Sequence, residues 1–468
     1  MANIIRPTSA SFLMTEDCNL RCTYCFEKHK KNKMTKETGV KAVEWLVNNA
    51  IYNHDNSIHV MFFGGEPLLN IDTMEEILEK GTELCKKKNL MFTASMVTNA
   101  TVMNERIYNV IKKYRDIVNF NIQLSVDGIP EIHDFYRVTA AGKGSFSMVK
   151  KNIPIFQELF GNDPNDKRLS IHGCINKKSL PYLYDSYSFF RKELGFKQIW
   201  FLPIVEEEWE QGDVELYREA NEKIFKDCIA EIKESKDIGD SYNYAPISKY
   251  CNLDRGRADK PCGAGYNFVT ITASGDVFPC HQIYFNDPDA SSKLGTIFEE
   301  LDYDKRRMFV EYDNSDIEGC AGCNNSQCYR CIAANWTHKG SLFSQMRKLY
   351  WGFMTIDNEF QHRMKQFVES HFSMEEQETC SSCGKKKAVE CLCNSRECQT
   401  PTGDCDIVHN QEFCQSGNNP DNPDCLCNVN SENQNMGDSQ NRLVLLESKM
   451  NMLESKLDII LSKLDKAN

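Results

Sequence analysis

The sequence predicts an α/β protein that begins with a parallel sheet curved into a partial (β/α)6 TIM-type barrel and continues into a small cysteine-rich α+β domain. Three observations lead to this prediction. Between residue 8 and about 205, short runs rich in branched and aromatic residues alternate with longer amphipathic stretches. Between 246 and 345, cysteines and turn-forming residues become dense. Near the end, over 441–468, apolar residues recur at alternating spacings of three and four, which is typical of a coiled-coil helix.

The predicted strands of the barrel are SASFLM, IHVMFF, FTASMVT, NFNIQLSV, LSIHGCI and IWFLPI. The stretches between them include KETGVKAVEWLVNNAIY, TMEEILEKGTELCKKK and NERIYNVIKKY, which have helical periodicity. Strand–helix units in a row indicate a parallel sheet, because each helix carries the chain back to the starting edge. In barrels of this kind, chemistry takes place in the loops after the carboxyl ends of the strands.

We expect four regions: the barrel at 1–245, the cysteine-rich domain at 246–375, a flexible cysteine-rich segment at 376–440 and the coiled-coil helix at 441–468. Within the second region, NFVTITASGDVFPCHQIY predicts a hairpin that turns at 274–276, and SLFSQMRKLYWGFMTIDNEFQHRMKQFVESHF predicts a helix that packs back on the protein. The third region has few large apolar residues and is expected to lack order without a metal or partner. For the last region, an amphipathic helix packing on its own domain remains the alternative.

Composition limits the partners. The net charge of −12 argues against nucleic acid and anionic membranes as partners, because both repel an acidic surface. No apolar run approaches the roughly 18 residues that a membrane-spanning helix needs, and MANIIRPTSASFLM does not resemble a signal peptide, so we expect a cytoplasmic protein. The chain has 22 cysteines, which in this compartment indicate metal binding rather than disulfides. Three isolated ones, Cys85, Cys174 and Cys228, are interpreted as small buried hydrophobes.

The first cysteine group is EDCNLRCTYCFE, which contains Cys18, Cys22 and Cys25 directly after the first predicted strand. Structural zinc and ordinary iron–sulfur clusters take four protein ligands, so a group of three leaves one metal position open. A zinc knuckle that lacks one ligand is the alternative.

This Cys-x3-Cys-x2-Cys spacing, followed by Phe26, resembles the signature of the radical S-adenosylmethionine superfamily. The resemblance implies that Cys18, Cys22 and Cys25 form the catalytic centre by holding a [4Fe-4S] cluster whose open iron binds S-adenosylmethionine. It also implies reductive cleavage to a 5′-deoxyadenosyl radical that abstracts hydrogen, with an electron donor such as flavodoxin or ferredoxin.

Further motifs match the superfamily's S-adenosylmethionine site. Gly64, Gly65, Glu66 and Pro67 follow the second predicted strand as the family's GGEP motif does, and the resemblance implies that Glu66 accepts from the methionine amine. Asn99, after Thr98, resembles a polar pair beside the ribose. In LSVDG and HDFYR, Ser125 is expected to reach the ribose and Arg137 the carboxylate. An ordinary turn at GGEP and a surface ion pair at Arg137 are the alternatives.

The second cysteine group resembles the SPASM domain, which carries two auxiliary [4Fe-4S] clusters. Carried over by position, the resemblance assigns Cys262, Cys280 and Cys331, with Cys251 as a further ligand, to the first auxiliary cluster. It assigns Cys320, Cys323 and Cys328 to the second. The usual closing cysteine is absent, so the second cluster either recruits Cys380 or Cys383 or keeps an open iron. A zinc ribbon of four cysteines is the alternative reading of 320–331.

The resemblance extends over residues 8 to about 345 and implies modification of a peptide or protein. Sulfatase maturases of this group usually carry an aspartate after the cysteine that aligns with Cys280, whereas this chain has His281, a candidate proton acceptor. The sequence PCHQ looks more like the thioether-forming maturases of ribosomally made peptides, so we expect a thioether or other crosslink. Many of those have a leader-recognition domain before the cysteine trio, and only seventeen residues precede Cys18, so a separate leader-recognition protein is expected.

Two alternatives stay open: oxidation of Cys or Ser to formylglycine in a sulfatase, and a non-enzymatic iron–sulfur scaffold assembled by the coiled coil into an oligomer. The tail cysteines either ligate a cluster, act as a tethered substrate, or stay reduced in a linker.

Overall fold

The protein is described here from a computed structural model, which covers residues 5–160, 166–204, 206–235, 262–287, 289–311, 331–333 and 348–371. All of these residues lie in one compact unit formed by 1–379 and 383–396. The predictions for 376–440 and for the coiled coil at 441–468 lie outside the described residues. So do six predicted cluster ligands: Cys251, Cys320, Cys323, Cys328, Cys380 and Cys383.

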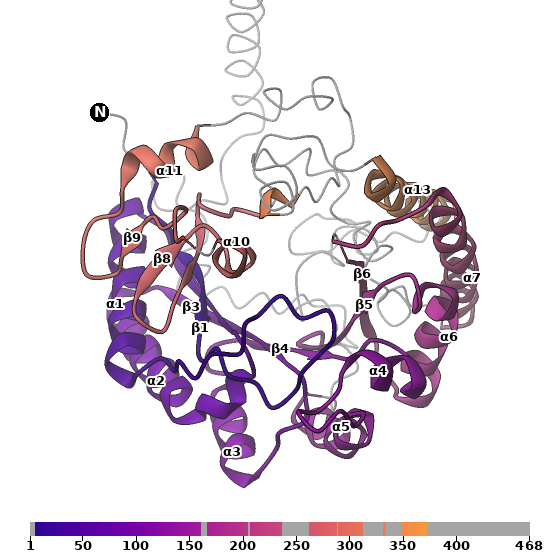
Figure 1. Cartoon of the computed structure of the whole chain (residues 1–468), viewed down its shortest axis with the longest axis horizontal. Helices are drawn as coiled ribbons and strands as arrows, with labels where there is room; N and C mark the ends of the chain where they lie inside the picture. The colour runs from indigo at the N-terminus through magenta and orange to yellow at the C-terminus, as the bar shows by residue number, and fades with distance from the viewer. Residues whose placement is uncertain are drawn as a thin grey trace, which may run out of the picture. The chain divides into compact units, whose positions relative to one another are not determined.

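The predicted parallel sheet is confirmed. Its six strands are β1 (Ser9–Leu13), β2 (Ser57–Phe63), β3 (Met91–Thr98), β4 (Phe120–Ser125), β5 (Leu169–Ile175) and β6 (Gln198–Pro203). They lie side by side in chain order and pair in parallel. Figure 1 shows the sheet curving, with the crossover helices on its outer face.

The predicted hairpin also forms, but it does not make a sheet of its own. Strand β7 (Phe268–Ile271) pairs in parallel with β1. Strand β8 (Asp276–Phe278) pairs antiparallel with β7, and β9 (Gly295–Thr296) with β8, so the sheet has nine strands. The cysteine-rich region therefore extends the barrel sheet at its β1 edge.

The helices that connect the barrel strands begin and end with local signals. Helix α1 (Lys36–Asn53) starts where Thr35 accepts from the backbone N–H of Thr38, and α3 (Glu105–Tyr114) starts where Asn104 accepts from Ile107. Helices α1 and α2 (Ile71–Lys88) end at His54 and Asn89, both in the left-handed conformation. The other described helices, both within the barrel and after it, are η1 (Pro67–Asn70), α4 (Pro130–Tyr136), α5 (Phe146–Phe160), η2 (Leu180–Tyr182), α6 (Leu183–Ser188), η3 (Phe189–Glu193), α7 (Gln211–Ser235), α10 (His281–Asn286), α11 (Tyr303–Val310) and α13 (Lys348–His371).

The core lies between the sheet and its outer helices, since alternate strand residues face them. In β2, Ile58, Val60 and Phe62 are buried in this core, whereas the intervening side chains are half-buried on the concave face. One of these is His59, whose ring nitrogens lie 2.9 Å from Thr93 Oγ1 and 3.0 Å from Ser95 Oγ. The concave face is therefore lined partly by polar groups.

The helix predicted from SLFSQMRKLYW onward is confirmed over Lys348–His371 and packs against α7 as expected. Its apolar side chains Phe353, Phe360 and Met364 are buried. Across the same contact, Arg363 donates to both carboxylate oxygens of Glu222, at 2.6 and 3.0 Å.

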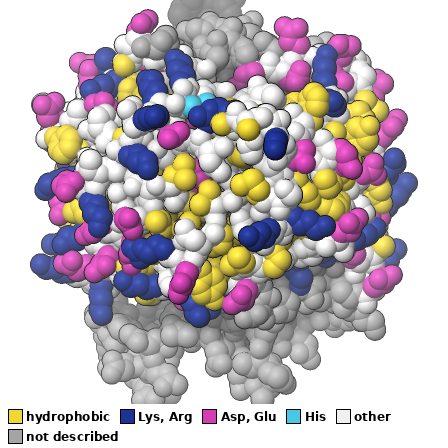
Figure 2. Space-filling view, turned by 60° about the horizontal axis from the view of Figure 1, so that its bottom comes forward, with side chains coloured by type: hydrophobic (Ala, Val, Ile, Leu, Met, Phe, Trp, Pro, Cys, Tyr) yellow, Lys and Arg dark blue, Asp and Glu magenta, His cyan; other side chains and the backbone are white. Residues whose placement is uncertain are grey.

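The outer surface mixes both signs of charge. Figure 2 shows lysine and arginine side chains interspersed with acidic ones over the face that it presents, with apolar side chains between them. Exposed ion pairs such as Lys36–Glu76, at 3.1 Å, each contribute little to stability. Among the described helices, none is both long and apolar enough to cross a membrane.

Candidate functional site

The loop that carries the cysteine trio follows β1 and lies at the carboxyl end of the sheet (Figure 1). Its backbone is hydrogen-bonded to the end of α4 and the segment after it, because Arg21 N–H donates to Val138 O at 2.6 Å and Thr23 N–H to Tyr136 O at 2.9 Å. The structure therefore places Cys18, Cys22 and Cys25 where catalysis is expected in a barrel of this kind.

All three cysteines are free, half-buried thiols. Burial raises the pKa of Cys18 to about 12 and that of Cys25 to about 11, and it also raises the pKa of Cys22. The Cys18 sulfur accepts from the N–H of Leu20 at 3.4 Å and from Asn99 Nδ2 at 3.6 Å. Such sulfurs become thiolates when a metal group holds them, and these donors suit a thiolate.

The trio was predicted to hold a cluster, with a single zinc ion as the alternative. In the described part of the chain, no three His, Cys, Asp or Glu side chains are close enough to hold one metal ion. A cubane cluster binds each cysteine through a different iron, so its sulfurs lie farther apart than those around one zinc ion. The cluster and the zinc knuckle both stay predictions.

The GGEP loop after β2 packs directly against the cysteine loop. A Cβ at Gly65 would lie 2.0 Å from the backbone oxygen of Asp17, and φ is +31° there, so only glycine fits. Next to it, Glu66 N–H donates to Asp17 O at 3.0 Å. These contacts give both glycines of the motif a structural reason, since Gly64, at φ +88°, also lies close to Thr15 O.

Glu66 is fully buried and joins the loops after β2 and β3. Its carboxylate accepts from Leu68 N at 3.1 Å, Thr98 Oγ1 at 2.8 Å and Asn99 N at 2.8 Å. Burial raises the pKa of Glu66 to about 7 against these hydrogen bonds. The expected contact with a methionine amine stays a prediction. In the structure, this carboxylate holds the loops after β2 and β3 together through its hydrogen bonds.

Asn99 and Ser125 lie at the carboxyl ends of neighbouring strands. The Asn99 side chain donates to Asn19 Oδ1 at 2.9 Å and accepts from Thr101 N at 2.9 Å, which ties it to the cysteine loop. Ser125 ends β4, is buried, and lies opposite His172 of β5 in the sheet register. Their expected roles beside a ribose stay predictions.

Arg137 forms a buried ion pair, so the alternative of a surface ion pair is wrong. Its Nη2 lies 3.0 Å from Asp127 Oδ1 and its Nε 3.0 Å from Asp127 Oδ2, and the two residues are 8% and 2% exposed. Asp127 also accepts from Tyr24 OH at 2.6 Å and from Cys174 N at 3.1 Å. Although burial acts to raise it, the pKa of Asp127 lies below its ordinary value because of the Arg137 guanidinium.

Asp127 was not predicted as a member of the site, and the prediction for one cysteine was wrong. Asp127 stands in LSVDG, where a charged residue directly after a buried strand was the available signal. Cys85 and Cys228 are buried apolar thiols as predicted, whereas Cys174 is half-buried beside Asp127. The difference follows from strand alternation, which turns Cys174 away from the helices.

Cys280 caps the start of α10, and its sulfur accepts from Ile283 N–H at 3.4 Å. Burial raises the pKa of Cys280, and the neighbouring thiols of Cys331 and Cys262 raise it further. The structure therefore brings together the three described residues that were predicted to hold the first auxiliary cluster.

His281 links the two cysteine regions. Its ring centroid lies 4.2 Å from that of Phe63, at the end of β2, and 6.2 Å from that of Phe26, next to Cys25. Burial lowers the pKa of His281 to about 4, so the imidazole is neutral near pH 7. Its Nδ1 is buried and has no hydrogen-bond partner in the described structure.

A group of carboxylates that the sequence analysis did not single out lies between these regions. Glu27 accepts from Gly65 N–H at 2.5 Å, and burial together with Glu16 and Glu66 raises its pKa to about 7. Tyr284 of α10 donates to Glu16 at 2.9 Å. The acidic residues on both sides of the cysteine trio were the signal available in the sequence.

The amino-terminal part of the chain resembles a known family. The model of the Radical SAM superfamily matches residues 12–169, which run from β1 to the start of β5. These residues are therefore similar to the radical SAM superfamily.

Two relatives and one solved structure refine this. The chain is 30% identical over 211 residues to the cysteine-type anaerobic sulfatase-maturating enzyme of Clostridium novyi (strain NT), which covers 44% of this chain and 52% of that protein. The chain thus spans about half the length of this relative. It is 26% identical over 369 residues to the antilisterial bacteriocin subtilosin biosynthesis protein AlbA of Bacillus subtilis (strain 168), which covers 72% of each. The structure of native anSMEcpe with bound AdoMet has the same fold, with a TM-score of 0.62 at 20% identity over 78% of this chain and all of that one.

Proposed function

We propose that this chain is a radical S-adenosylmethionine enzyme that modifies a peptide, forming a thioether or other crosslink in a ribosomally made substrate. The observation that carries the proposal is the contact of His281 with Phe26, which joins the two cysteine regions. The pairing of β7 with β1 supports it, because it fuses the second cysteine region to the barrel. An electron-accepting cluster in the second cysteine region can thus lie near a radical-forming cluster held by the cysteine trio.

The residues present fit the cofactors that this function needs. Cys18, Cys22 and Cys25 would hold the radical [4Fe-4S] cluster, and Cys262, Cys280 and Cys331 would hold an auxiliary one. When bound, these clusters and S-adenosylmethionine supply a 5′-deoxyadenosyl radical and an electron acceptor. The cysteines at 251, 320, 323, 328, 380 and 383 are proposed as the remaining ligands.

The chain's own side chains would bind S-adenosylmethionine and accept the proton of the substrate thiol. The loop Gly64–Pro67, Asn99 and Ser125 would bind S-adenosylmethionine, and Arg137 would offer its carboxylate a cation that Asp127 keeps in place. His281 would take the proton from the substrate thiol through its Nδ1, which has no hydrogen-bond partner in the described structure. Thioether formation balances when carbon loses a hydrogen atom, sulfur loses a proton and one electron leaves.

A sulfatase-maturating reaction is the second candidate, because the relative from Clostridium novyi is named for it. In that reaction a Cys or Ser of a sulfatase becomes formylglycine. His281 would again accept a proton. A flavodoxin or ferredoxin donor, a separate leader-recognition protein and an oligomer formed through 441–468 belong to the first proposal.

The test is anaerobic turnover of the iron-loaded chain with S-adenosylmethionine, a reductant and candidate peptides. Crosslinking predicts loss of two hydrogen atoms and of one alkylatable thiol from a cysteine-containing peptide, whereas sulfatase maturation predicts an aldehyde in a sulfatase-motif peptide. Replacing Cys18 with Ala should abolish the formation of 5′-deoxyadenosine. The matched Cys85→Ala should not, because Cys85 lies on the buried face of α2, in the hydrophobic core. An iron-loaded chain that forms no 5′-deoxyadenosine would instead support the non-enzymatic scaffold.

A further inference from the structure

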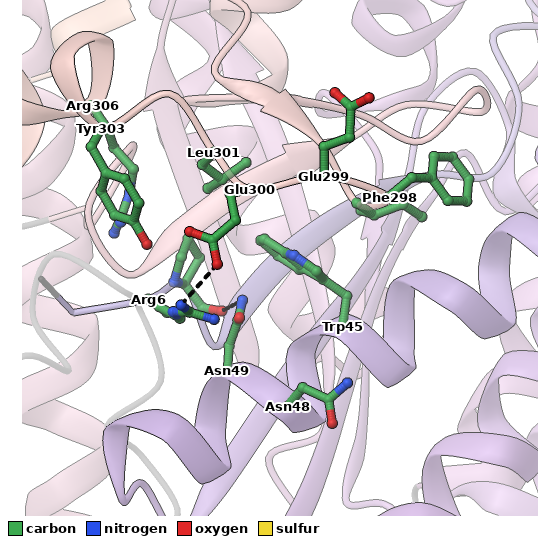
Figure 3. A pocket seen from close by; sticks show the side chains of 12 residues that line it. Arg6, Trp45, Asn48, Asn49, Phe298, Glu299, Glu300, Leu301, Tyr303 and Arg306 are labelled. Carbon is green, nitrogen blue, oxygen red and sulfur yellow. Dashed lines mark hydrogen bonds and ion pairs between the residues drawn. The ribbon is translucent and has the colours of Figure 1, made fainter.

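A pocket of about 300 Å³ lies at the other end of the sheet from the cysteine trio. Its walls come from the segment before β1, from the second half of α1, from the segment between β9 and α11 and from the start of α11 (Figure 3). Because Arg6 comes before β1 and Cys18 comes after it, the pocket is separate from the radical site.

Arg306, on one wall, is a buried cation whose hydrogen-bond partners among the described residues are all neutral. It is 1% exposed, and its guanidinium donates to the backbone oxygens of Gly265 at 3.1 Å, Ile5 at 2.5 Å and Tyr266 at 2.6 Å. Its Nη1 is buried without a hydrogen-bond partner in the described structure. A buried charge is costly unless an opposite charge meets it, so this arrangement indicates a site for an anion.

The lowered pKa of Arg306 agrees with this geometry. Burial lowers it to about 10, and Arg6 also acts to lower it. The side chain nevertheless carries its charge near pH 7, and a bound anion would return the pKa toward its ordinary value.

Arg6 supplies a second cation that a ligand can reach. Its Nη2 lies 3.2 Å from Glu300 Oε1, and the Glu300 side chain is 71% exposed. An ion pair this exposed contributes little, so a ligand carboxylate can take the place of Glu300. Figure 3 shows this pair between Trp45 and Tyr303, with the Glu299 carboxylate directed away from it.

Aromatic surface lies beside these charges. Trp45 and Tyr303 line the pocket, and Phe298 on its rim is 60% exposed. A ligand with an apolar group would cover these rings while its charged end reaches the guanidinium groups.

We infer that this pocket binds a carboxylate carried next to an aromatic or aliphatic group. Arg306 Nη1 and Arg6 receive the carboxylate, and Trp45 and Phe298 contact the apolar part. A singly charged carboxylate suits the site better than phosphate, because the nearby Glu299 and Glu300 repel a second negative charge. The carboxylate comes either from a free acid or from an acidic residue beside an apolar one in a peptide. This site does not depend on the reaction proposed above.

The test is calorimetric titration of the full-length, iron-loaded chain with phenylacetate and with its neutral analogue phenylacetamide. We expect phenylacetate to bind at least about 10-fold more tightly, because only it forms charge-assisted hydrogen bonds. N-acetyl-Glu-Phe-amide and its Gln counterpart form the second arm, and the tighter carboxylate binder identifies the source. If neither carboxylate binds more tightly than its neutral counterpart, the inference is wrong.

Variants locate the binding to this pocket without disturbing the buried Arg306. Glu300→Gln should tighten phenylacetate about 3-fold or more by releasing Arg6, and Arg6→Gln should weaken it about 10-fold. Glu311→Gln is the matched control, since Glu311 pairs with Arg307 outside the pocket and should leave the affinity unchanged. Equal affinities for the wild type, Glu300→Gln and Arg6→Gln would overturn the assignment.

Discussion

Replacing Asp127 with Asn should destabilise this protein more than most single changes of charge. The substitution keeps the shape of the side chain but leaves the Arg137 guanidinium buried without its counterion, which lies at 3.0 Å through both Nε and Nη2. Removing one partner of a buried ion pair costs about 3–5 kcal/mol, whereas exposed pairs contribute about 0–1 kcal/mol. Urea unfolding of the iron-free chain, followed by circular dichroism, should show this loss in the free energy of unfolding.

The double variant Asp127→Asn with Arg137→Gln should recover about 2 kcal/mol or more of the summed losses, because no charge is then left buried. The exposed pair Arg218–Glu359, at 2.6 Å, gives the matched control through Glu359→Gln. A loss for Asp127→Asn no larger than that of Glu359→Gln would refute the reasoning.

The pH dependence gives a second check on the same pair. The pKa of Asp127 is lowered in the folded protein, so its stabilisation is present above its unfolded pKa and is lost as the pH falls through the folded value. The difference between wild type and Asp127→Asn should therefore shrink below about pH 4.

Three further predictions concern other parts of the site. Ser145 donates to Arg137 O at 2.7 Å, so it accepts from Nε2–H of the buried His133, whose pKa burial lowers to about 3. Between about pH 3 and pH 6.5 the unfolded chain has a protonated His133, whereas the folded chain keeps this imidazole neutral. The free energy of unfolding should therefore fall by about 1.4 kcal/mol for each pH unit of acidification in this range. In unfolding measured across an acid titration, His133→Gln should reduce this slope. Gly65→Ala should abolish 5′-deoxyadenosine formation, because its Cβ would meet Asp17 O, whereas Gly142→Ala, at φ +72° with open space around it, should cost only about 1–2 kcal/mol and keep activity. His281→Phe should retain cleavage of S-adenosylmethionine but lose product in a peptide-modification assay; full product yield would remove His281 from the proposed chemistry.

The parts of the fold that the sequence predicted depend on neighbouring residues. Six strands were located to within one or two residues, since branched and aromatic runs between amphipathic stretches mark them locally. The trio after β1 and the GGEP loop after β2 were placed correctly for the same reason. The domain boundaries stay predictions, and the hairpin's addition to β1 was not foreseen, because pairing between distant strands leaves no local pattern.

The candidate site was predicted less completely than the fold. The trio, Arg137 and His281 were found from their motifs. Asp127, the carboxylate that pairs with the buried Arg137, was not predicted. The hydrogen bond between Tyr284 and Glu16, which lie 268 residues apart in the chain, was not predicted either. Alternation along β5 also placed Cys174 on the concave face, contrary to the prediction that it belongs to the core.

The sequence by itself was enough to predict which groups would hold a metal cluster, because ligands to one cluster often lie a few residues apart in a single loop. Only the tertiary structure decided which charges are buried, which are paired and which face a pocket. Burial and pairing result from contacts between distant segments. In the described part of the chain, these contacts pair Arg137 with the Asp127 carboxylate and Arg306 with backbone oxygens alone.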